Sequence, residues 1–427
     1  MSTDSLVQGL QALLRPGDTL WWGQATAEPL TLTRALVDNR HALAQDGRLR
    51  VFVGIGVSDT LRPEQADVID FFGYSAGGPH RKLAQAGVLD IVPCHYSHLP
   101  GLIEEGLLPA DVVLLQVSPP DAQGRYSLGL VHEYLPAALR KARVVIAEVN
   151  PEIPWTHGSL YLSADDFALL VDAQHAPLSL ERSAPGPVEL AIAGHIAALV
   201  EDGATLQVGI GNLPEAVLSA LHGHRDLGLH SGAVGDGIAA LAEAGVLTNA
   251  RKSLDAGVGI GGVLMGSERL RKWAHGNPGF ALRETAYTHD AQVLACSHKL
   301  AAINSAIEVD LTGQINAEVV GGVYVGAVGG ALDFLRGAAR SRGGLPIVAL
   351  PATAKGATRI VAQLSGPVST PRSDAGLIVT EYGVADLRGQ PLSRRVRRLI
   401  DIAAPEHRAE LERQGHALLR QCGASFH

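Results

Sequence analysis

The chain of 427 residues is poor in cysteine, in aromatic residues and in local runs of charge. Its three cysteines, Cys94, Cys296 and Cys422, lie far apart without metal-ligand spacing, which favours a reduced, cytoplasmic compartment. There is no window of 18 uncharged apolar residues and no basic segment leading into an apolar core at the N-terminus, so we expect neither a membrane span nor export. The formal charge of −8 is spread along the chain, which argues against a nucleic-acid partner.

Hydrophobic residues, in contrast, make up 46% of the chain, and its length fits two domains of about 200 residues. Short β-branched runs alternate with helical patterns and end in Pro, Ser or Asn. This alternation predicts an α/β fold with open, mostly parallel sheets covered on both faces. The clearest predicted strands are residues 19–22, 49–55, 88–92, 112–117, 144–149, 227–230, 347–350 and 377–380.

A proline-rich stretch, residues 174–188, interrupts this pattern and predicts a boundary between domains at 1–180 and 188–427. Just after it the opening of the chain recurs, since residues 16–23 resemble residues 202–209 at a constant offset. The recurrence predicts two similar halves that face each other across a cleft, which is the default place for a ligand.

The most glycine-rich stretch, residues 319–330, is an apolar segment that leads into a helical pattern beginning near Asp333. Glycines let backbone N–H groups approach a ligand closely, and the start of a helix favours negative charge. The stretch therefore predicts a site for a phosphate, a carboxylate or a developing oxyanion, although a strand-to-helix turn without a ligand has the same composition. A second glycine loop of this kind covers residues 208–215.

Several segments together resemble the acetyl-CoA hydrolase/transferase family, in particular its 4-hydroxybutyrate CoA-transferase branch. The resemblance extends over nearly the whole chain. The segments are residues 115–124, 150–158, 208–214, 304–314, 328–338 and 379–389.

The resemblance implies two CoA-transferase-type α/β domains facing a cleft, with coenzyme A bound as an acyl-CoA substrate and no metal or prosthetic group. In that family a glutamate attacks the thioester, and CoA passes through a glutamyl-CoA thioester to an acceptor carboxylic acid. Backbone N–H groups of the two glycine loops would stabilise the oxyanions. Lys355 and Arg359, which flank a loop after the predicted strand 347–350, could meet the CoA phosphates, although a surface location explains them as well. The residues predicted to contact CoA are Gly209, Gly211, Asn212, Gly326, Val328, Gly329, Gly330, Lys355 and Arg359.

The chain departs from the family where the nucleophile is expected. Gly232 stands in place of the glutamate, and Ala331 stands where the family usually has glutamine. Another carboxylate could replace the missing one, and Glu64 is the first candidate, with Glu28 the second, because both follow strands of the first half. A helix-capping or helix-dipole role would also account for each of them.

If no carboxylate attacks, His230 could act as a base that activates water, which would make the protein an acyl-CoA hydrolase. A hydrogen-bonded structural histidine is the alternative for that residue. A protein that only binds acyl-CoA is the third possibility. In every case the expected partners are acyl-CoA and small carboxylic acids, and size and family resemblance suggest a homodimer.

Overall fold

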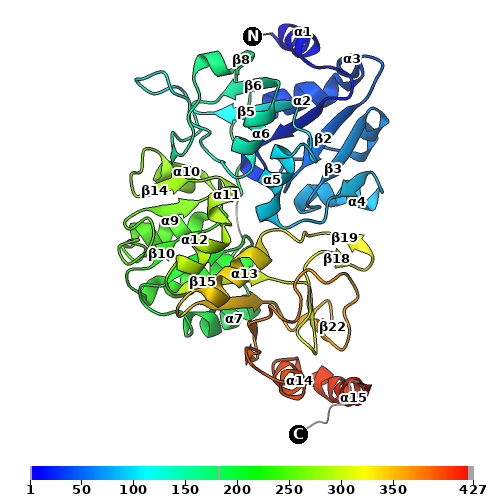
Figure 1. Ribbon diagram of the computed structural model, residues 1–427, viewed down its shortest axis with the longest axis vertical. Helices are drawn as coiled ribbons and strands as arrows, with labels where there is room; N and C mark the ends of the chain where they lie inside the picture. Colours follow the sequence, from blue (N-terminus) through cyan, green and yellow to red (C-terminus); the bar gives the residue numbers. More distant parts are fainter. Residues whose placement is uncertain (1, 181–182, 422–427) are drawn as a thin grey trace.

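The computed structural model describes residues 2–180 and 183–421. The chain forms two α/β halves, the first drawn from blue through cyan into green and the second from green through yellow to red (Figure 1). Helix α1 lies at one end of the molecule, and α14 and α15 lie at the opposite end, next to the second half.

The sheet of the first half has seven parallel strands in the order β4-β3-β2-β1-β5-β6-β8. Both faces of its central strands are buried, as the predicted apolar runs require. The strands are β1 (Thr19–Trp22), β2 (Leu49–Val53), β3 (Ile69–Gly73), β4 (Leu89–Ile91), β5 (Val112–Val117), β6 (Val144–Val149) and β8 (Leu169–Asp172).

The sheet of the second half has the order β10-β9-β15-β20-β24-β25 and is parallel except for β25, which forms a hairpin with β24. The strands are β9 (Thr205–Val208), β10 (Gly228–Leu229), β15 (Leu300–Ser305), β20 (Leu345–Ala349), β24 (Leu377–Thr380) and β25 (Gly383–Asp386). The predicted fold class, two α/β halves with open and mostly parallel sheets, is confirmed.

The recurring sequence segment forms equivalent strands in the two sheets. Strand β1 lies between β2 and β5, and β9 lies between β10 and β15, in each case with parallel neighbours. All described strands of the first sheet precede residue 173, and those of the second follow residue 204. The predicted boundary between 180 and 188 remains a prediction that agrees with this division.

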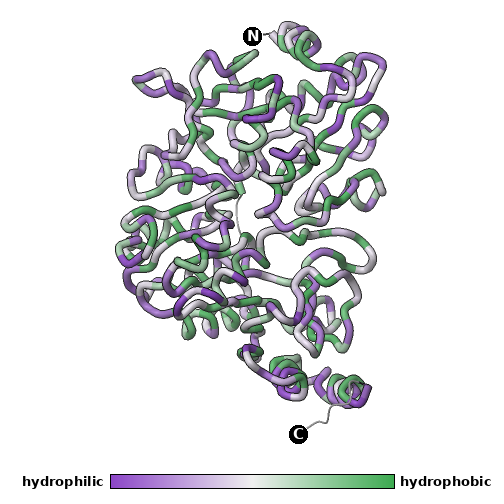
Figure 2. Tube along the Cα trace, viewed as in Figure 1, coloured by the Kyte–Doolittle hydropathy of each residue, from purple (hydrophilic) through white to green (hydrophobic). Residues whose placement is uncertain are grey.

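Helices connect the strands and cover the sheets (Figure 1). They are α1 (Thr3–Leu13), α2 (Leu30–Asp38), α3 (Arg40–Ala44), α4 (Arg81–Gln85), α5 (Leu99–Glu104), α6 (Leu135–Lys141), α7 (Pro187–Ala197), α8 (Asn212–Ala220), α9 (Asp236–Glu243), α10 (Glu268–Ala274), α11 (Thr285–Thr288), α12 (Ala291–Cys296), α13 (Ala331–Arg340), α14 (Leu392–Asp401) and α15 (Pro405–Gln421). Hydrophobic and hydrophilic bands alternate along α14 and α15 in Figure 2, and α14 buries Val396, Leu399 and Ile400.

Small sheets complete the second half and join it to the first. Strand β7 lies in sequence between β6 and β8 of the first sheet, yet it pairs with β14, a strand of the second half. The additional strands are β7 (His157–Gly158), β11 (Ala233–Val234), β12 (Gly259–Gly261), β13 (Val263–Leu264), β14 (Phe280–Leu282), β16 (Glu308–Asp310), β17 (Ile315–Asn316), β18 (Val319–Val320), β19 (Val323–Tyr324), β21 (Thr353–Ala354), β22 (Ala357–Thr358) and β23 (Ile360–Val361).

The glycine-rich stretch differs from its predicted form. Strands β18 and β19 form a short antiparallel hairpin, because Gly321 and Gly322 adopt φ angles of 56° and 79°, which turn the chain back on itself. Only the residues after β19 form the loop that leads into α13, and this helix begins at Ala331, slightly before the predicted start. The end of the described chain forms two helices, α14 and α15, and Cys422 lies outside the described residues.

An aromatic cluster forms the centre of the first half. Trp21 is fully buried, its ring stacks on Phe52 with centroids 3.6 Å apart, and Tyr134 meets it edge-on at 5.5 Å. The Nε1 atom of Trp21 donates a hydrogen bond to the carbonyl oxygen of Pro109 at 2.8 Å, so the one polar atom of the ring is satisfied.

We predict that Trp21→Ala lowers the free energy of unfolding by about 3–5 kcal/mol, because it leaves a large cavity beside the stacked ring. Urea unfolding followed by circular dichroism measures the change. Leu107→Ala is the matched control, since the Leu107 side chain is 65% exposed and should change stability by less than about 0.5 kcal/mol. A Trp21→Ala protein as stable as the control would contradict this account of the core.

Candidate active site

A cleft with a volume of about 180 Å³ lies between the two halves. The first half contributes mainly polar and aromatic side chains, and the second half contributes the end of β9, the loop before α13 and the start of that helix. Its lining includes Gln24, Tyr74, Tyr96, Glu133, Gln207, Gly209, Gly232, His289, Asn304, Gly329, Gly330, Ala331 and Phe334.

A hydrogen-bond network in the first half centres on the amide of Gln24. Its Oε1 accepts from the hydroxyl of Tyr74 at 2.6 Å and from the backbone N–H of Ile55 at 3.0 Å. Its Nε2 donates to Oε2 of Glu133 at 2.7 Å and to the hydroxyl oxygen of Tyr96 at 3.0 Å. The amide therefore has partners on both sides and holds the Glu133 carboxyl group in one orientation.

Glu133 is the acidic residue of this cleft. Its side chain is 3% exposed, and burial raises the pKa of its carboxyl group to about 8, against the hydrogen bonds from Gln24 and Tyr96, which favour the charged form. Its backbone has a φ of 42°, a conformation that non-glycine residues rarely adopt. A strained backbone and a perturbed carboxyl group in one residue are typical of functional sites.

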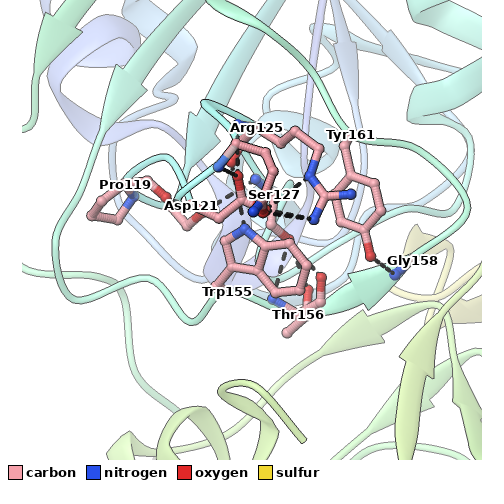
Figure 3. A network of polar contacts seen from close by, with 10 residues as sticks. Pro119, Asp121, Arg125, Ser127, Trp155, Thr156, Gly158 and Tyr161 are labelled. Atoms are coloured by element: carbon pink, nitrogen blue, oxygen red, sulfur yellow. Dashed lines mark hydrogen bonds and ion pairs between the residues drawn. The ribbon is translucent and has the colours of Figure 1, made fainter. Parts of the chain in front are cut away.

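The segment that precedes Glu133, residues 118–129, is held by a polar network from two of the family-like motifs (Figure 3). The backbone N–H of Ser127 donates to Oγ of Ser118 at 3.1 Å, and its own hydroxyl donates to the carbonyl oxygen of Thr156 at 2.9 Å. Nearby, the Arg125 guanidinium pairs with Asp121 at 2.7 Å and lies over the ring of Tyr161. These contacts fix residues 118–129, the stretch of chain directly before the cleft.

His132, next to Glu133, explains the glycine of the predicted Thr156-His157-Gly158 motif. The His132 ring is fully buried, and burial lowers its pKa to about 3, so the ring is neutral. A Cβ on Gly158 would lie 2.4 Å from two atoms of that ring. Only glycine therefore lets the imidazole pack there and keeps the backbone of the Glu133 segment in place.

Across the cleft from this network, the second half contributes the paired side-chain amides of Gln207 and Asn304 and the N-terminus of α13. Gln207 at the end of β9 and Asn304 in β15 exchange hydrogen bonds of 3.3 and 2.9 Å between their side-chain amides. Ala331 begins α13 and lines the cleft, so the first-turn N–H groups of a ten-residue helix lie at its edge. This end of the helix favours negative charge in the cleft.

Gly232, at the position expected for the family's nucleophile, also lines the cleft. A Cβ there would lie 3.0 Å from Cε1 of His289, so this imidazole fills much of the space that a side chain would enter. The His289 ring packs against Phe334, with centroids 4.5 Å apart, and against Tyr96, at 5.1 Å. Burial lowers its pKa to about 3, which makes the ring a neutral and weak base.

Three of the predicted glycine-loop residues, Gly209, Gly329 and Gly330, line the cleft. Four others lie near it without lining it. Gly211 and Asn212 form the start of α8, where the Asn212 amide donates to the hydroxyl of Ser183 at 2.7 Å. Gly326 accepts a backbone hydrogen bond from Ala76, and Val328 lies between the two groups of loop glycines.

The structure does not bring either predicted replacement carboxylate to the cleft. Glu64 is exposed in the first turn of a 3₁₀ helix, Pro63–Asp67, which fits the alternative of a helix-dipole partner. Glu28 is buried, and its two carboxyl oxygens accept from the hydroxyls of Thr33 at 2.8 Å and Ser58 at 2.6 Å. Burial raises the Glu28 pKa, and its hydrogen bonds hold the chain after β1.

His230 and the two predicted phosphate partners lie outside the cleft lining as well. The Nε2 atom of His230 donates to the carbonyl oxygen of Thr288 at 3.0 Å, and burial lowers its pKa to about 4. Lys355 is exposed in the turn between β21 and β22, and Arg359 donates to the carbonyl oxygen of Ile307 at 2.6 Å. The hydrogen bond and burial of His230 fit the structural role that was the alternative to a catalytic one.

Sequence reasoning missed Glu133, Gln24 and His289. One signal was present for the first of them, because His132 and Glu133 are two ionisable residues within an otherwise apolar run, residues 128–137. Buried charged groups of this kind need a partner or a function.

The described residues were compared with the requirements of a membrane-spanning helix and of a metal site. In residues 2–180 and 183–421, no helix is long and apolar enough to cross a membrane. The same part of the chain holds no group of three or more His, Cys, Asp or Glu side chains arranged to bind a metal ion.

Comparison with known proteins identifies the class of protein that has this fold and cleft. The acetyl-CoA hydrolase/transferase N-terminal domain is matched over residues 7–167, and the acetyl-CoA hydrolase/transferase C-terminal domain over residues 266–415. The chain therefore belongs to the acetyl-CoA hydrolase/transferase family, as its motifs predicted.

The chain is also similar to individual members of this family. The chain is 37% identical to the 4-hydroxybutyrate coenzyme A transferase of Clostridium kluyveri over 91% of its own length and 92% of that protein. RipA from Yersinia pestis superposes with a TM-score of 0.91 at 31% identity, covering 98% of this chain and 99% of RipA. A 4-hydroxybutyrate CoA-transferase from Porphyromonas gingivalis superposes with a TM-score of 0.81 at 31% identity, covering 97% of each chain. The predicted enzyme class, a CoA-transferase, is supported by these relatives.

We predict that Glu133→Gln changes how stability depends on pH. The folded pKa of about 8 lies above the value of about 4.3 for an unfolded glutamate, so between these pH values only the folded state keeps the proton. The free energy of unfolding of the wild type should therefore fall steadily as pH rises from about 4.3 to 8, because the contribution of the protonated Glu133 carboxyl group is lost. The Gln variant has no such group, so its free energy of unfolding lacks this fall.

Urea unfolding of both proteins at pH 5, 6, 7 and 8 measures the difference, which should move in favour of Glu133→Gln at each step. Glu148→Gln is a matched comparison, since burial raises the Glu148 pKa to about 7 and the same trend should level off earlier. Parallel stability curves for wild type and Glu133→Gln would show that the Glu133 carboxyl group ionises normally.

Proposed function

We propose that the protein transfers CoA from a short-chain acyl-CoA to a carboxylic acid of the acetate, butyrate, 4-hydroxybutyrate or dicarboxylate type. The observation that carries this proposal is the cleft itself, in which a buried carboxyl group faces two glycine loops and the start of a helix. Relatives named as CoA-transferases for 4-hydroxybutyrate and for butyryl-CoA and acetate support this choice of substrates.

The size and chemistry of the cleft support a short acyl group. Ligand pockets commonly have volumes of about 300–1,000 Å³, whereas this cleft has about 180 Å³. It has room for the acyl group and the thioester but not for the whole of CoA, whose remainder would extend outward. Its apolar lining, which includes Val208, Val263 and Phe334, suits a short hydrocarbon chain.

Backbone N–H groups support the thioester chemistry. Attack on a thioester carbonyl places negative charge on its oxygen, and preorganised N–H donors stabilise that charge. The start of α13 at Ala331 and the adjacent Gly329 and Gly330 supply such donors at the cleft edge. In this proposal those two glycines and Gly209 contact the acyl thioester, while Lys355 and Arg359 take no part in binding it.

Hydrolysis with a histidine as the base is disfavoured, because burial lowers the pKa values of both His230 and His289. A base that activates water works best with a pKa near the operating pH. His289 is the histidine of this cleft, and burial lowers its pKa to about 3, so it is a poor base for that purpose. A carboxylate acceptor needs no such base, because it is already a nucleophile.

The proposal includes a cytoplasmic homodimer. The size and family of the chain support a symmetric dimer, and its few, widely spaced cysteines support a reducing compartment. Sedimentation velocity of the purified protein measures the assembly.

We predict that the purified chain converts butyryl-CoA and acetate into acetyl-CoA and butyrate without releasing free CoA. Liquid chromatography of the CoA esters follows both products, and a thiol reagent follows free CoA. Free CoA that appears at the same rate with and without acetate would favour a hydrolase. No turnover over a panel of acyl-CoA and carboxylate pairs would leave only the acyl-CoA-binding alternative.

We also predict that Gly330→Ala lowers turnover about a hundredfold, because its Cβ would lie 2.5 Å from Nε2 of His289 and displace that ring into the cleft. Gly194→Ala, at an exposed position of α7 where a Cβ meets nothing within 4 Å, is the matched control. Both proteins should unfold at similar urea concentrations. Full activity in Gly330→Ala would place the reaction away from this cleft.

A further inference from the structure

We propose that Glu133 is the catalytic nucleophile of this chain and takes the place of the glutamate that Gly232 lacks. The inference rests on the proposed CoA-transferase function and adds to it the residue that carries CoA between the two acids. Three independent features of the structure support it.

The first feature is the position of Glu133 relative to Gly232. Both residues line the cleft, and both pack on Gly262. A Cβ on Gly262 would lie 3.2 Å from Cγ of Glu133 and 2.7 Å from the carbonyl oxygen of Gly232. That carbonyl accepts from the backbone N–H groups of Gly262 and Val263, and the Gly262 carbonyl accepts from the N–H of His132 at 2.9 Å, so backbone hydrogen bonds link the three segments. A carboxyl group thus reaches the neighbourhood of Gly232 from the opposite half.

The second feature is that Glu133 is the acidic side chain among the residues lining this cleft. Glu64 is exposed elsewhere, and both oxygens of Glu28 are occupied by hydroxyl groups. In the described parts of the chain, Glu133 is therefore the carboxyl group that a thioester seated against Gly329 and Gly330 would meet.

The third feature is that contacts from both halves hold Glu133, since the second half binds its strained backbone and the first half binds its carboxyl group. The Glu133 carbonyl accepts from the backbone N–H of Thr285 at 2.9 Å, and Glu133 forms an isolated bridge with Glu284. The Gln24 amide orients the carboxyl group. Glu133 combines a φ of 42° with a place in the cleft lining, and strained backbone is found preferentially at functional sites.

The chemistry balances without a cofactor or a redox step. An oxygen of ionised Glu133 attacks the thioester carbon, the C–S bond breaks, and CoA leaves as a thiolate, which gives an acyl-glutamyl anhydride. The thiolate attacks the Glu133 carbonyl carbon and releases the first acid as its carboxylate, which leaves a glutamyl-CoA thioester. The acceptor carboxylate then repeats both steps in reverse order, so that a new acyl-CoA forms and the Glu133 carboxylate is regenerated.

Ionisation of Glu133 must precede the attack. Because burial raises its pKa to about 8, the group is mostly protonated at pH 7 in the free protein. The value of kcat/KM should therefore rise about tenfold per pH unit below pH 8 and level off above it. A flat profile between pH 6 and 8 would contradict the assignment.

Covalent trapping tests the residue directly. Wild-type protein is incubated with butyryl-CoA, reduced with sodium borohydride, digested and mapped by mass spectrometry. Reduction of a glutamyl-CoA thioester converts the side chain into a primary alcohol, and we expect that alcohol at residue 133. The same product at another carboxylate, or normal turnover without any trapped product, would overturn the inference while the proposed function stands. Absence of turnover in the wild type would instead defeat the proposed function, and this inference with it.

Substitution provides the second measurement. Glu133→Gln should lower turnover by about a thousandfold or more, abolish trapping and leave butyryl-CoA binding within about threefold in a calorimetric titration. Glu133→Asp should retain part of the activity with a changed pH profile. Glu148→Gln is the matched control, because Glu148 is equally buried, accepts from the backbone N–H of Thr31 at 2.8 Å and does not line the cleft. If Glu133→Gln fails to fold, trapping in the wild type still decides the question.

Discussion

The hydrogen bond from the Gln24 amide to the Glu133 carboxyl group is the interaction on which the cleft depends. Removal of a carboxyl group from water is costly unless it has partners, and here one amide supplies a donor while its oxygen is held by Tyr74 and by the backbone of Ile55. These hydrogen bonds do not fully offset the loss of water around the charged carboxylate, so the pKa of Glu133 is raised. The same burial that makes the acid hard to ionise also keeps water away from the place where a thioester would react.

Much of the fold follows from the sequence, because buried parallel strands have a strong local signature. The runs at 19–22, 112–117, 144–149 and 377–380 became strands with those same limits, since each is mostly apolar and is followed by a residue that ends a strand. The recurring segment also marked equivalent strands. The hairpin at β18 and β19 was not predicted, because apolar periodicity does not indicate which glycines adopt a positive φ.

The site was less accessible from sequence for a specific reason. Strand-end loops containing Gly209, Gly329 and Gly330 were found because glycine patterns are local. Glu133 lies in none of these loops, and it reaches the cleft through a strained turn whose backbone partners are Thr285 and, through His132, Gly262. A search for carboxylates after strands therefore selected Glu64 and Glu28. Contacts between segments distant in sequence, rather than any motif, bring Glu133 into position.

The pairing of β7 with β14 has a consequence for how ligands are admitted. On one side of the cleft this pairing is accompanied by bridges from Val131 to Val263 and from Glu133 to Glu284. On the other side His95 bridges to Gly329, and the N–H of Ala76 bonds to Gly326. Backbone hydrogen bonds thus join the two halves on both sides of the cleft, and a hinge-like opening would have to break one of these two sets. We expect the cleft to keep a nearly constant width through turnover. Selection among carboxylic acids would then depend on the fixed shape of the cleft and not on closure of the two halves around the substrate.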